Sequence, residues 1–430
     1  MPDIDPRTEF AAALRDERVD DARLLLLRHP NLRAGLNEPI PGGAFGAEPL
    51  LVAVQRKNRE MVDLLVSAGA DINGKSDWWA GGFGLLEGCD ADFAPFLIER
   101  GATIYPNAAA KLAMLDALRS LIAADPAAAR ARGGDGQTPL HVAATVEIAQ
   151  ALLDAGAEID ALDVDHESTP AQYAIGDRTE VARFLASRGA RVDILLACAL
   201  GEIARVRRIL DDDPAAIGVA VDAEHFPMRD ARAGGHIYTW TLGDNKTPHA
   251  VAKAFGHQDV LDLLMLRTPD DLRLGIAYQT GDDKTAAALV AGRPNVAASL
   301  SPAAQRVLVE SVQANDAAAV RRLLRAGWPT AAHASGQATA LHWASYRGNA
   351  EIVRDLLASH AGVDAREDRF GGTPLGWALH GALHAGGKRD DDYLPVVEAL
   401  LAAGAAAPEM AEPSTFSPVL VAAIRRARAI

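Results

Sequence analysis

The sequence predicts an all-α protein in which pairs of helices stack along the chain as a solenoid. Two recurring phrases support this fold, one that ends a helix and one that begins a helix, and they alternate along the 430 residues. The composition agrees with it, because alanine is the best helix former and aromatic residues make up only 5% of the chain. We expect about twelve degenerate helix-pair repeats.

The first phrase consists of two or three apolar residues, a short polar step, and then Gly or Pro. It is typical of the end of an amphipathic helix, since Gly adopts the left-handed conformation after the last turn and Pro cannot continue a helix. Most copies are spaced by about 25 to 35 residues. They end at Pro30, Gly69, Gly101, Pro126, Gly156, Gly189, Pro214, Pro269, Pro294, Gly327, Gly362 and Gly404.

The second phrase lies about half a repeat away and typically contains Thr-Pro. A Thr hydroxyl accepts hydrogen bonds from the first amides of a helix, and Pro lacks an amide that would have no partner there. The phrase therefore predicts the start of the first helix of a repeat. Its copies begin at Glu48, Thr138, Thr169, Thr247, Thr339 and Thr373.

The opening Thr-Pro-Leu-His-x-Ala at Thr138–Ala143, with a second helix ending in Leu-Leu-x-x-Gly-Ala, resembles the ankyrin repeat. Gln137–Asp193 and Gln337–Gly404 are most similar to it. The resemblance implies two antiparallel helices and a hairpin-like finger in each repeat. It also implies a curved array that binds other proteins on a concave face of fingers and first helices.

We expect a single solenoid over residues 1–430 with irregular parts. At Asp193–Ile194 and Pro269–Leu272 the next helix begins at once and leaves no room for a finger. The segment Val221–Asp244 has an alternating run, which favours an extended finger or a short β-hairpin. The predicted parts are an N-terminal cap repeat (7–45), repeats (46–220), an extended finger insertion (221–245), repeats (246–408) and a C-terminal capping helix (409–430). Residues 384–393 are expected to form a loop.

The net charge of −14 argues against nucleic acid and anionic membrane surfaces as partners, since both require clustered Lys and Arg. No apolar run reaches the length of a membrane span, and we expect no secretory signal because the N-terminal residues have neither a basic nor an apolar region. Cys89 and Cys198 are expected to be buried free thiols. We expect a cytoplasmic monomer, and the excess of Arg over Lys suggests a bacterial source.

The sequence contains no Walker A run, dinucleotide glycine fingerprint, HExxH or GxSxG motif, so an enzyme is not favoured and no cofactor is expected. We expect a non-catalytic scaffold that binds another protein. The alternative is an enzyme or a protein that binds a small molecule or metal in a pocket between the 221–245 finger and the Trp343 and Trp377 helices.

The candidate partner-binding residues are mostly aromatic, because Trp, Tyr and Arg dominate binding hot spots. Those just before Ala in the second phrase are Tyr173, Trp343 and Trp377; those about one turn later are Phe255, Tyr346, Arg347 and His380; those on the long finger are Tyr238 and Trp240. For Trp343 and Trp377, packing under the next finger is an equal alternative.

Two groups have residue types that bind metals. His380 and His384 lie four residues apart near Asp390–Asp392, but a solvated helix end beside an acidic loop is favoured over a metal site. The run Asp163, Asp165, His166 and Glu167 is interpreted as a turn, since Asp163 occupies the turn-forming position of a finger. His141 and His342 belong to the second phrase and are expected to be structural. We therefore predict no metal.

Overall fold

The computed structural model describes residues 5–292, 299–333, 337–368, 370–384, 390–409 and 416–428. Within these residues the regular structure is helical, and the only β-type pairings are two isolated bridges, Lys75 with Gly84 and His333 with Thr339. The predicted all-α class is confirmed. In the same ranges, the helices are too short or too polar to cross a bilayer. The predicted helix end at Pro294 and residues 385–389 of the predicted 384–393 loop lie outside the described residues.

The chain divides into two compact units. Unit 1 consists of Met1–Leu200 and Pro227–Leu242, and unit 2 consists of Gly201–Phe226 and Gly243–Ile430. The predicted Val221–Asp244 insertion is therefore shared, since its middle part belongs to unit 1 and its two ends belong to unit 2.

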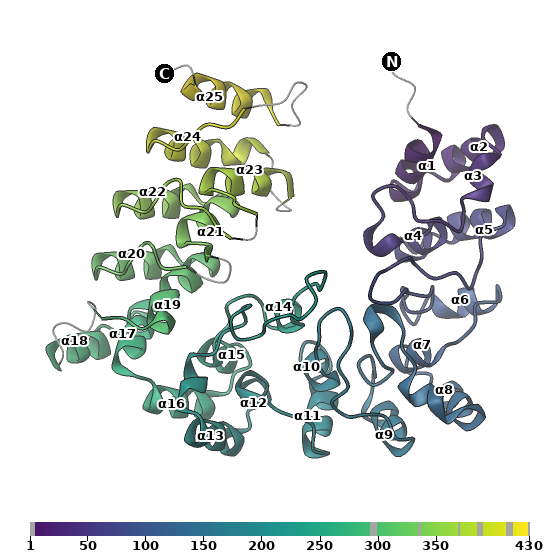
Figure 1. The fold of residues 1–430 in the computed structure, drawn as a ribbon, viewed down its shortest axis with the longest axis horizontal. Coiled ribbons are helices and arrows are strands. Elements are labelled where there is room, and N and C mark those ends of the chain that lie inside the picture. The colour runs from purple at the N-terminus through teal and green to yellow at the C-terminus, as the bar shows by residue number, and fades with distance from the viewer. Residues whose placement is uncertain are drawn as a thin grey trace. The chain divides into compact units, whose positions relative to one another are not determined.

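Unit 1 is a succession of short helices that begins with a helix pair, as the sequence predicts (Figure 1). Its α-helices are α1 (Pro6–Arg15), α2 (Val19–Arg28), α3 (Asn31–Ala34), α4 (Pro49–Gln55), α5 (Arg59–Ala68), α6 (Ala94–Ile98), α7 (Pro106–Lys111), α8 (Leu115–Ala124), α9 (Val146–Asp154), α10 (Pro170–Ala174), α11 (Thr179–Ser187), α12 (Ile194–Leu200) and α14 (Tyr238–Thr241). The 3₁₀ turns are η1 (Ala44–Gly46), η2 (Pro126–Arg130) and η3 (Gly134–Gly136).

Unit 2 has longer helices and ends in the predicted C-terminal helix. Its α-helices are α13 (Ile203–Asp212), α15 (Pro248–Ala254), α16 (Gln258–Arg267), α17 (Asp270–Thr280), α18 (Asp283–Gly292), α19 (Pro302–Gln313), α20 (Ala317–Arg325), α21 (Ala340–Tyr346), α22 (Ala350–Ala358), α23 (Pro374–His384), α24 (Leu394–Ala402) and α25 (Pro418–Arg428). The 3₁₀ turns are η4 (Pro214–Gly218) and η7 (Asp390–Tyr393).

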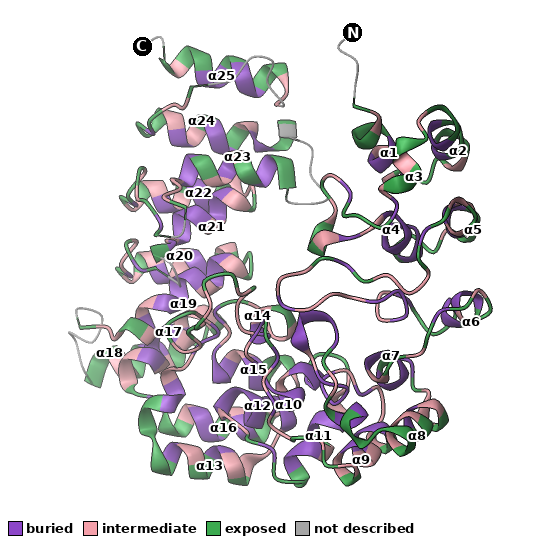
Figure 2. Ribbon diagram, turned by 45° about the vertical axis from the view of Figure 1, so that its right-hand side comes forward, coloured by how far each residue is buried: buried purple, intermediate pink, exposed green. Residues whose placement is uncertain are grey.

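Within unit 2 the first helices α19, α21 and α23 stack on one side and the second helices α20, α22 and α24 stack on the other (Figure 1). Each repeat packs against its neighbours, so the apolar core runs along the stack instead of around a centre. Figure 2 shows the buried positions concentrated where helices face one another. This arrangement is a helical solenoid, and it leaves one row of first helices to form a continuous surface.

The Thr residues of the second phrase cap helices at four of the five predicted positions. Thr169 and Thr339 form capping boxes with Gln172 and His342. Thr247 accepts from the amide of Ala250, and Thr373 accepts from that of Gly376.

The exception is Thr138, the start of the best-matching opening. Here Pro139–Val142 forms turns instead of a helix. The second helix α9 follows almost at once, capped by Thr145, so there is no length of chain for a full first helix. The predicted helix start at Thr138 is therefore wrong.

Most of the predicted glycine helix ends are confirmed, since Gly69, Gly101, Gly156, Gly189, Gly327 and Gly404 all have positive φ. Gly362 does not. In that repeat His360 has φ 61° and occupies the left-handed position, and the amide of Ala361 bonds to the carbonyl of Leu356, just as Ala70 bonds to Leu65. The prediction was displaced by two residues.

The missing fingers are confirmed, because α12 begins at Ile194 and α17 begins at Asp270. The β-hairpin expected in Val221–Asp244 is wrong. The alternating run forms the short helix α14, since the amides of Thr239, Trp240 and Leu242 bond to carbonyls three or four residues back. Its apolar side chains Ile237 and Tyr238 are buried in unit 1 instead of pairing with a second strand.

Candidate functional site

Two rows of aromatic side chains run along the first helices of unit 2. Trp343 and Trp377 occupy the same position in successive repeats, and their rings meet edge to face with centroids 5.1 Å apart. Tyr346 and His380 are equivalent in the same way and stack at 6.1 Å with an interplanar angle of 26°. The repeat spacing thus turns single aromatic positions on α21 and α23 into continuous rows.

The two rows contact each other and form what we call the aromatic face: Trp343, Tyr346, Trp377 and His380. Tyr346 meets Trp377 edge to face at 6.1 Å and Trp343 at 6.5 Å. Such pairs contribute about 0.5 to 1.5 kcal/mol beyond burial. The face is therefore a preorganised surface.

The side chains of the aromatic face differ in how far they are exposed to solvent. Trp343 is half-buried and packs against the core of unit 2, and Trp377 and Tyr346 are also half-buried. His380 is exposed, and so is Arg347, which follows α21 directly. The tryptophans therefore combine packing with partial exposure, while the side chains of His380 and Arg347 are exposed.

The remaining predicted partner-binding residues have different environments. Phe255 is half-buried at the end of α15 in unit 2. Trp240 is 70% exposed on α14 of unit 1. Tyr173 and Tyr238 are buried in unit 1, and their hydroxyls donate to Asp163 and Asp193 respectively, both at 2.9 Å. The expectation that these two tyrosines lie on an accessible surface is wrong, because both side chains are buried and each hydroxyl donates to a carboxylate within unit 1.

His380 and His384 lie on the exposed end of α23 with ring centroids 4.4 Å apart. Neither belongs to a group of three or more metal-ligating residues among those the structure describes. Two such groups are found, and both lie elsewhere: Asp135 with Asp165 and His166, and Asp222 with Glu224 and His225.

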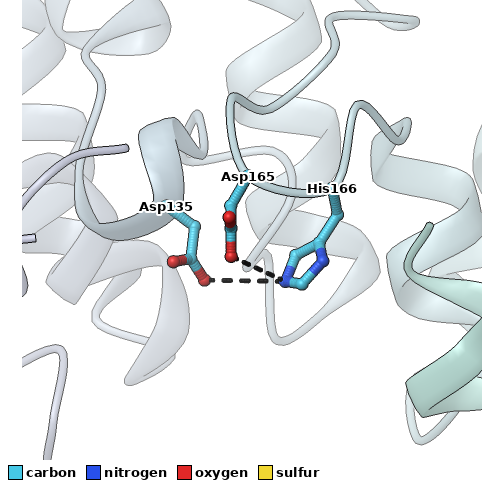
Figure 3. A group of neighbouring side chains, drawn as sticks. All are labelled: Asp135, Asp165 and His166. Carbon is cyan, nitrogen blue, oxygen red and sulfur yellow. Dashed lines mark ion pairs between the residues drawn. The ribbon is translucent and has the colours of Figure 1, made fainter. Parts of the chain in front are cut away.

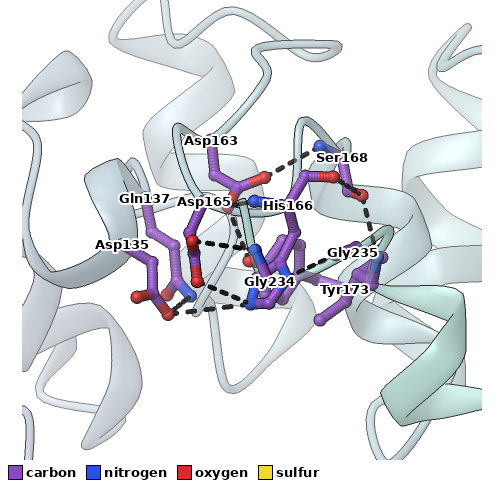
Figure 4. Close-up of polar contacts among 10 residues, drawn as sticks. Asp135, Gln137, Asp163, Asp165, His166, Ser168, Tyr173, Gly234 and Gly235 are labelled. Atoms are coloured by element: carbon purple, nitrogen blue, oxygen red, sulfur yellow. Dashed lines mark hydrogen bonds and ion pairs between the residues drawn. The ribbon is translucent and has the colours of Figure 1, made fainter. Parts of the chain in front are cut away.

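The turn role predicted for Asp163 is confirmed. Its carboxylate accepts from the amides of His166 and Ser168, three and five residues later, both at 2.8 Å (Figure 4). Glu367 of unit 2 does the same, since it accepts from Phe370 and Gly372 at the corresponding offsets. Both acids stand six residues before the Thr of the second phrase. This position therefore shapes the finger.

The structural role of His141 and His342 is also confirmed. The His141 Nδ1 accepts from the amide of Thr138 at 3.0 Å, and its Nε2 lies 3.0 Å from the carbonyl oxygen of Ser168 in the next finger. His342 bonds in the same way to Thr339 and Gly372. Each histidine links one repeat to the next.

A second cluster lies in unit 1, at the tips of two successive fingers. Asp135 and His166 each stand three residues before a Thr, so the stacking of the repeats places them side by side. The His166 Nε2 is 3.6 Å from the Asp165 Oδ2 and 4.0 Å from the Asp135 Oδ2 (Figure 3). All three residues are buried.

The segment Pro227–Leu242 covers this cluster. The amide of Gly234 donates to the Asp165 Oδ1 at 3.1 Å, and the carbonyl oxygen of Gly235 lies 2.7 Å from the His166 Nδ1 (Figure 4). Burial raises the pKa of Asp135 to about 6, against the opposing effect of His166 and with the reinforcement of Asp165 and Asp163. The site thus concentrates acceptor atoms away from solvent.

Sequence reasoning singled out Asp165 and His166 but missed Asp135. The signal was present, because Asp135 and His166 hold the same place relative to Thr138 and Thr169. The contribution of Gly234 and Gly235 had no such signal, since they lie about 70 residues further along and outside the repeat.

In unit 2, helix pairs stack side by side and are joined by fingers, and the first helices of the pairs form one surface. This arrangement defines a helical repeat protein. Comparison with known families agrees with this. The model of ankyrin repeats in three copies matches residues 107–196 and 308–409, and the single ankyrin repeat model matches residues 45–77. These matches span about half of the chain, and the chain belongs to the ankyrin repeat family.

Two similar proteins have been described. The palmitoyltransferase Hip14 of Drosophila melanogaster is 32% identical over 127 residues, which is 30% of this chain. The match spans only 18% of that protein's length. Among solved structures, the human ASB11 ankyrin repeat domain aligns with 71% of this chain and 100% of its own, at 19% identity and a TM-score of 0.28.

Proposed function

We propose that this chain is a non-catalytic scaffold and that unit 2 binds another protein through the aromatic face. The observation that carries the proposal is the pair of aromatic rows on α21 and α23, with exposed Arg347 and His380 beside half-buried rings. Binding hot spots combine Trp, Tyr and Arg in this way. Ankyrin repeats generally bind proteins, and the fold alone does not name the partner.

Rings that contact one another in this way are suited to binding. A ring that is already held by its neighbours loses little conformational entropy when a partner covers it. The alternative, an enzyme or a pocket-binding protein formed by the Val221–Asp244 segment with the Trp343 and Trp377 helices, has no observation in its favour among the described residues. We propose a cytoplasmic location and a monomeric state with the scaffold function.

The experiment places a photo-crosslinking amino acid, p-benzoylphenylalanine, at position 346, 347 or 380 of the full chain in the source cells. The matched control is position 354, because Arg354 is exposed on the second helix α22. The proposal expects one protein to be crosslinked from all three positions and not from position 354. Equal labelling from position 354, or no specific product from the other three, would contradict it.

A further inference from the structure

The His166 Nε2 makes no hydrogen bond to Asp135 or Asp165, although other atoms of the three residues are hydrogen-bonded to Gln137, Gly234 and Gly235. The separations of 3.6 Å and 4.0 Å between the His166 Nε2 and the two carboxylates exceed the 2.7 to 3.2 Å typical of such bonds. They do match two ligands of one ion, because atoms each about 2.1 Å from a metal lie roughly 3 to 4 Å apart. Figure 3 shows both carboxylates directed toward the same edge of the imidazole.

The tautomer of His166 supports a ligand role. The Gly235 carbonyl can only accept, so the His166 Nδ1 at 2.7 Å carries the proton and donates it. In the neutral ring the Nε2 is then a bare acceptor that faces two further acceptors. Metal-ligating histidines commonly donate their other ring N–H to a backbone carbonyl in this manner.

An unsatisfied atom gives independent support. Asp135 is 8% exposed, and its Oδ1, the oxygen that does not make the 4.0 Å approach to His166, is buried without a hydrogen-bond partner. Leaving such an oxygen unpaired costs about 1 to 3 kcal/mol, more when it is charged, and a cation bound by both oxygens of Asp135 would remove this cost. Gly234 packs closely against the cluster, since a Cβ there would lie 3.0 Å from the Asp165 Oδ2.

We propose that Asp135, Asp165 and His166 bind a divalent transition-metal ion of the Zn²⁺ class. One imidazole with two carboxylates suits Zn²⁺ or Mn²⁺, whereas Ca²⁺ takes six to eight oxygen ligands. The ion joins two successive fingers, and through Gly234 and Gly235 it holds the Pro227–Leu242 segment in place. It is therefore a structural ion for unit 1.

The other group, Asp222 with Glu224 and His225, differs in the feature that matters. The His225 Nδ1 lies 2.8 Å from the Asp222 Oδ1 and forms a hydrogen bond with it. Arg306 lies 4.0 Å from both Asp222 and Glu224, so a cation is already present. This group lies in unit 2 and provides the matched control.

The test uses the purified full chain, stripped with EDTA and dialysed, and titrated with ZnCl₂ and then MnCl₂ in a calorimeter. We expect one ion per chain and a rise in the melting temperature when it binds. Because changes in the outer shell of a site weaken metal affinity by about 10 to 100-fold, the ligand variant Asp135→Asn is expected to weaken it by at least about 100-fold. His225→Gln is expected to leave it unchanged.

Asp135→Asn preserves shape, and far-UV circular dichroism checks its fold; Asp165→Asn is the second variant. Absence of saturable binding by the wild-type chain would overturn the proposal and would leave a protonated His166 as the cation of the cluster. Unchanged affinity in folded Asp135→Asn and Asp165→Asn, or equal loss in His225→Gln, would overturn it as well.

Discussion

We predict that protonation of the buried His249 destabilises unit 2 in acid. The ring is buried at 6% exposure, and its Nε2 lies 2.7 Å from the Thr268 hydroxyl, which itself donates to the carbonyl of Leu264. Since that hydrogen is used, the Thr268 oxygen accepts from the ring, which is consistent with a neutral histidine. Burial alone lowers the pKa of His249 from 6.5 to about 4.

The sign follows from the direction of the shift. The folded state disfavours the protonated ring, so the stability that depends on neutral His249 is fully present above pH 6.5 and is lost as the pH falls toward 4. A difference of one pKa unit between the folded and unfolded states corresponds to about 1.4 kcal/mol, so the full loss of unfolding free energy is about 3 kcal/mol. At pH 5 the loss is about 2 kcal/mol relative to pH 7.

The assay is urea unfolding at pH 7 and pH 5 of the wild-type chain and of His249→Gln, which cannot titrate. His141 and His236 have lowered pKa values too, so the wild-type chain loses stability from several sites and the comparison between variants isolates one. We expect the difference in unfolding free energy between the two pH values to shrink by about 2 kcal/mol in His249→Gln. The control His360→Asn changes an exposed ring, and Asn tolerates its left-handed backbone.

An equal pH dependence in the wild-type chain and His249→Gln would refute the reasoning. It would mean that the ring is charged or solvated in the folded protein. A similar shrinkage in His360→Asn would refute it too, since exposure would then have no part in the effect.

Two further predictions concern buried polar groups. Burial raises the pKa of Glu310 to about 7, only partly offset by Arg306 and Lys246, so the protonated carboxyl contributes stability below pH 4.5 that is lost as the pH rises through 7. In urea unfolding, Glu310→Gln should therefore stabilise unit 2 by on the order of 2 kcal/mol at pH 8 and by little at pH 4. A loss of stability at pH 8 would contradict this. Tyr238→Phe removes the 2.9 Å hydrogen bond to Asp193 and should lower the unfolding free energy by about 1 to 3 kcal/mol. The control Tyr105→Phe changes a 38% exposed ring and should lower it by less than about 0.5 kcal/mol. Equal effects of the two variants would show that the hydrogen bond of Tyr238 contributes nothing.

The fold was predictable because the helix starts and helix ends of each repeat depend on residues close to them in the sequence. Caps such as Thr169 and Thr373, and helix ends such as Gly69 and Gly404, are decided by a few neighbouring residues. Departures arose where chain length decided instead. After Thr138 the next helix begins too soon for a first helix to form, and His360 takes the glycine position without being glycine.

The candidate sites were predictable only where the repeat period brings residues together. Trp343 with Trp377, and Tyr346 with His380, follow from that period. Whether a tyrosine faces solvent depends on tertiary packing, and Tyr238 is buried with its hydroxyl donating to Asp193, 45 residues away. Contacts of that kind leave no mark in the local sequence.

The most direct test of the scaffold function measures the affinity of the crosslinked partner for three forms of the full chain. The account predicts that the double variant Arg347→Ala with His380→Ala weakens binding by at least about 10-fold, or about 1.4 kcal/mol, relative to wild type. It predicts an unchanged affinity for Arg354→Ala on α22. Equal affinities of all three forms would contradict the aromatic face as the binding surface.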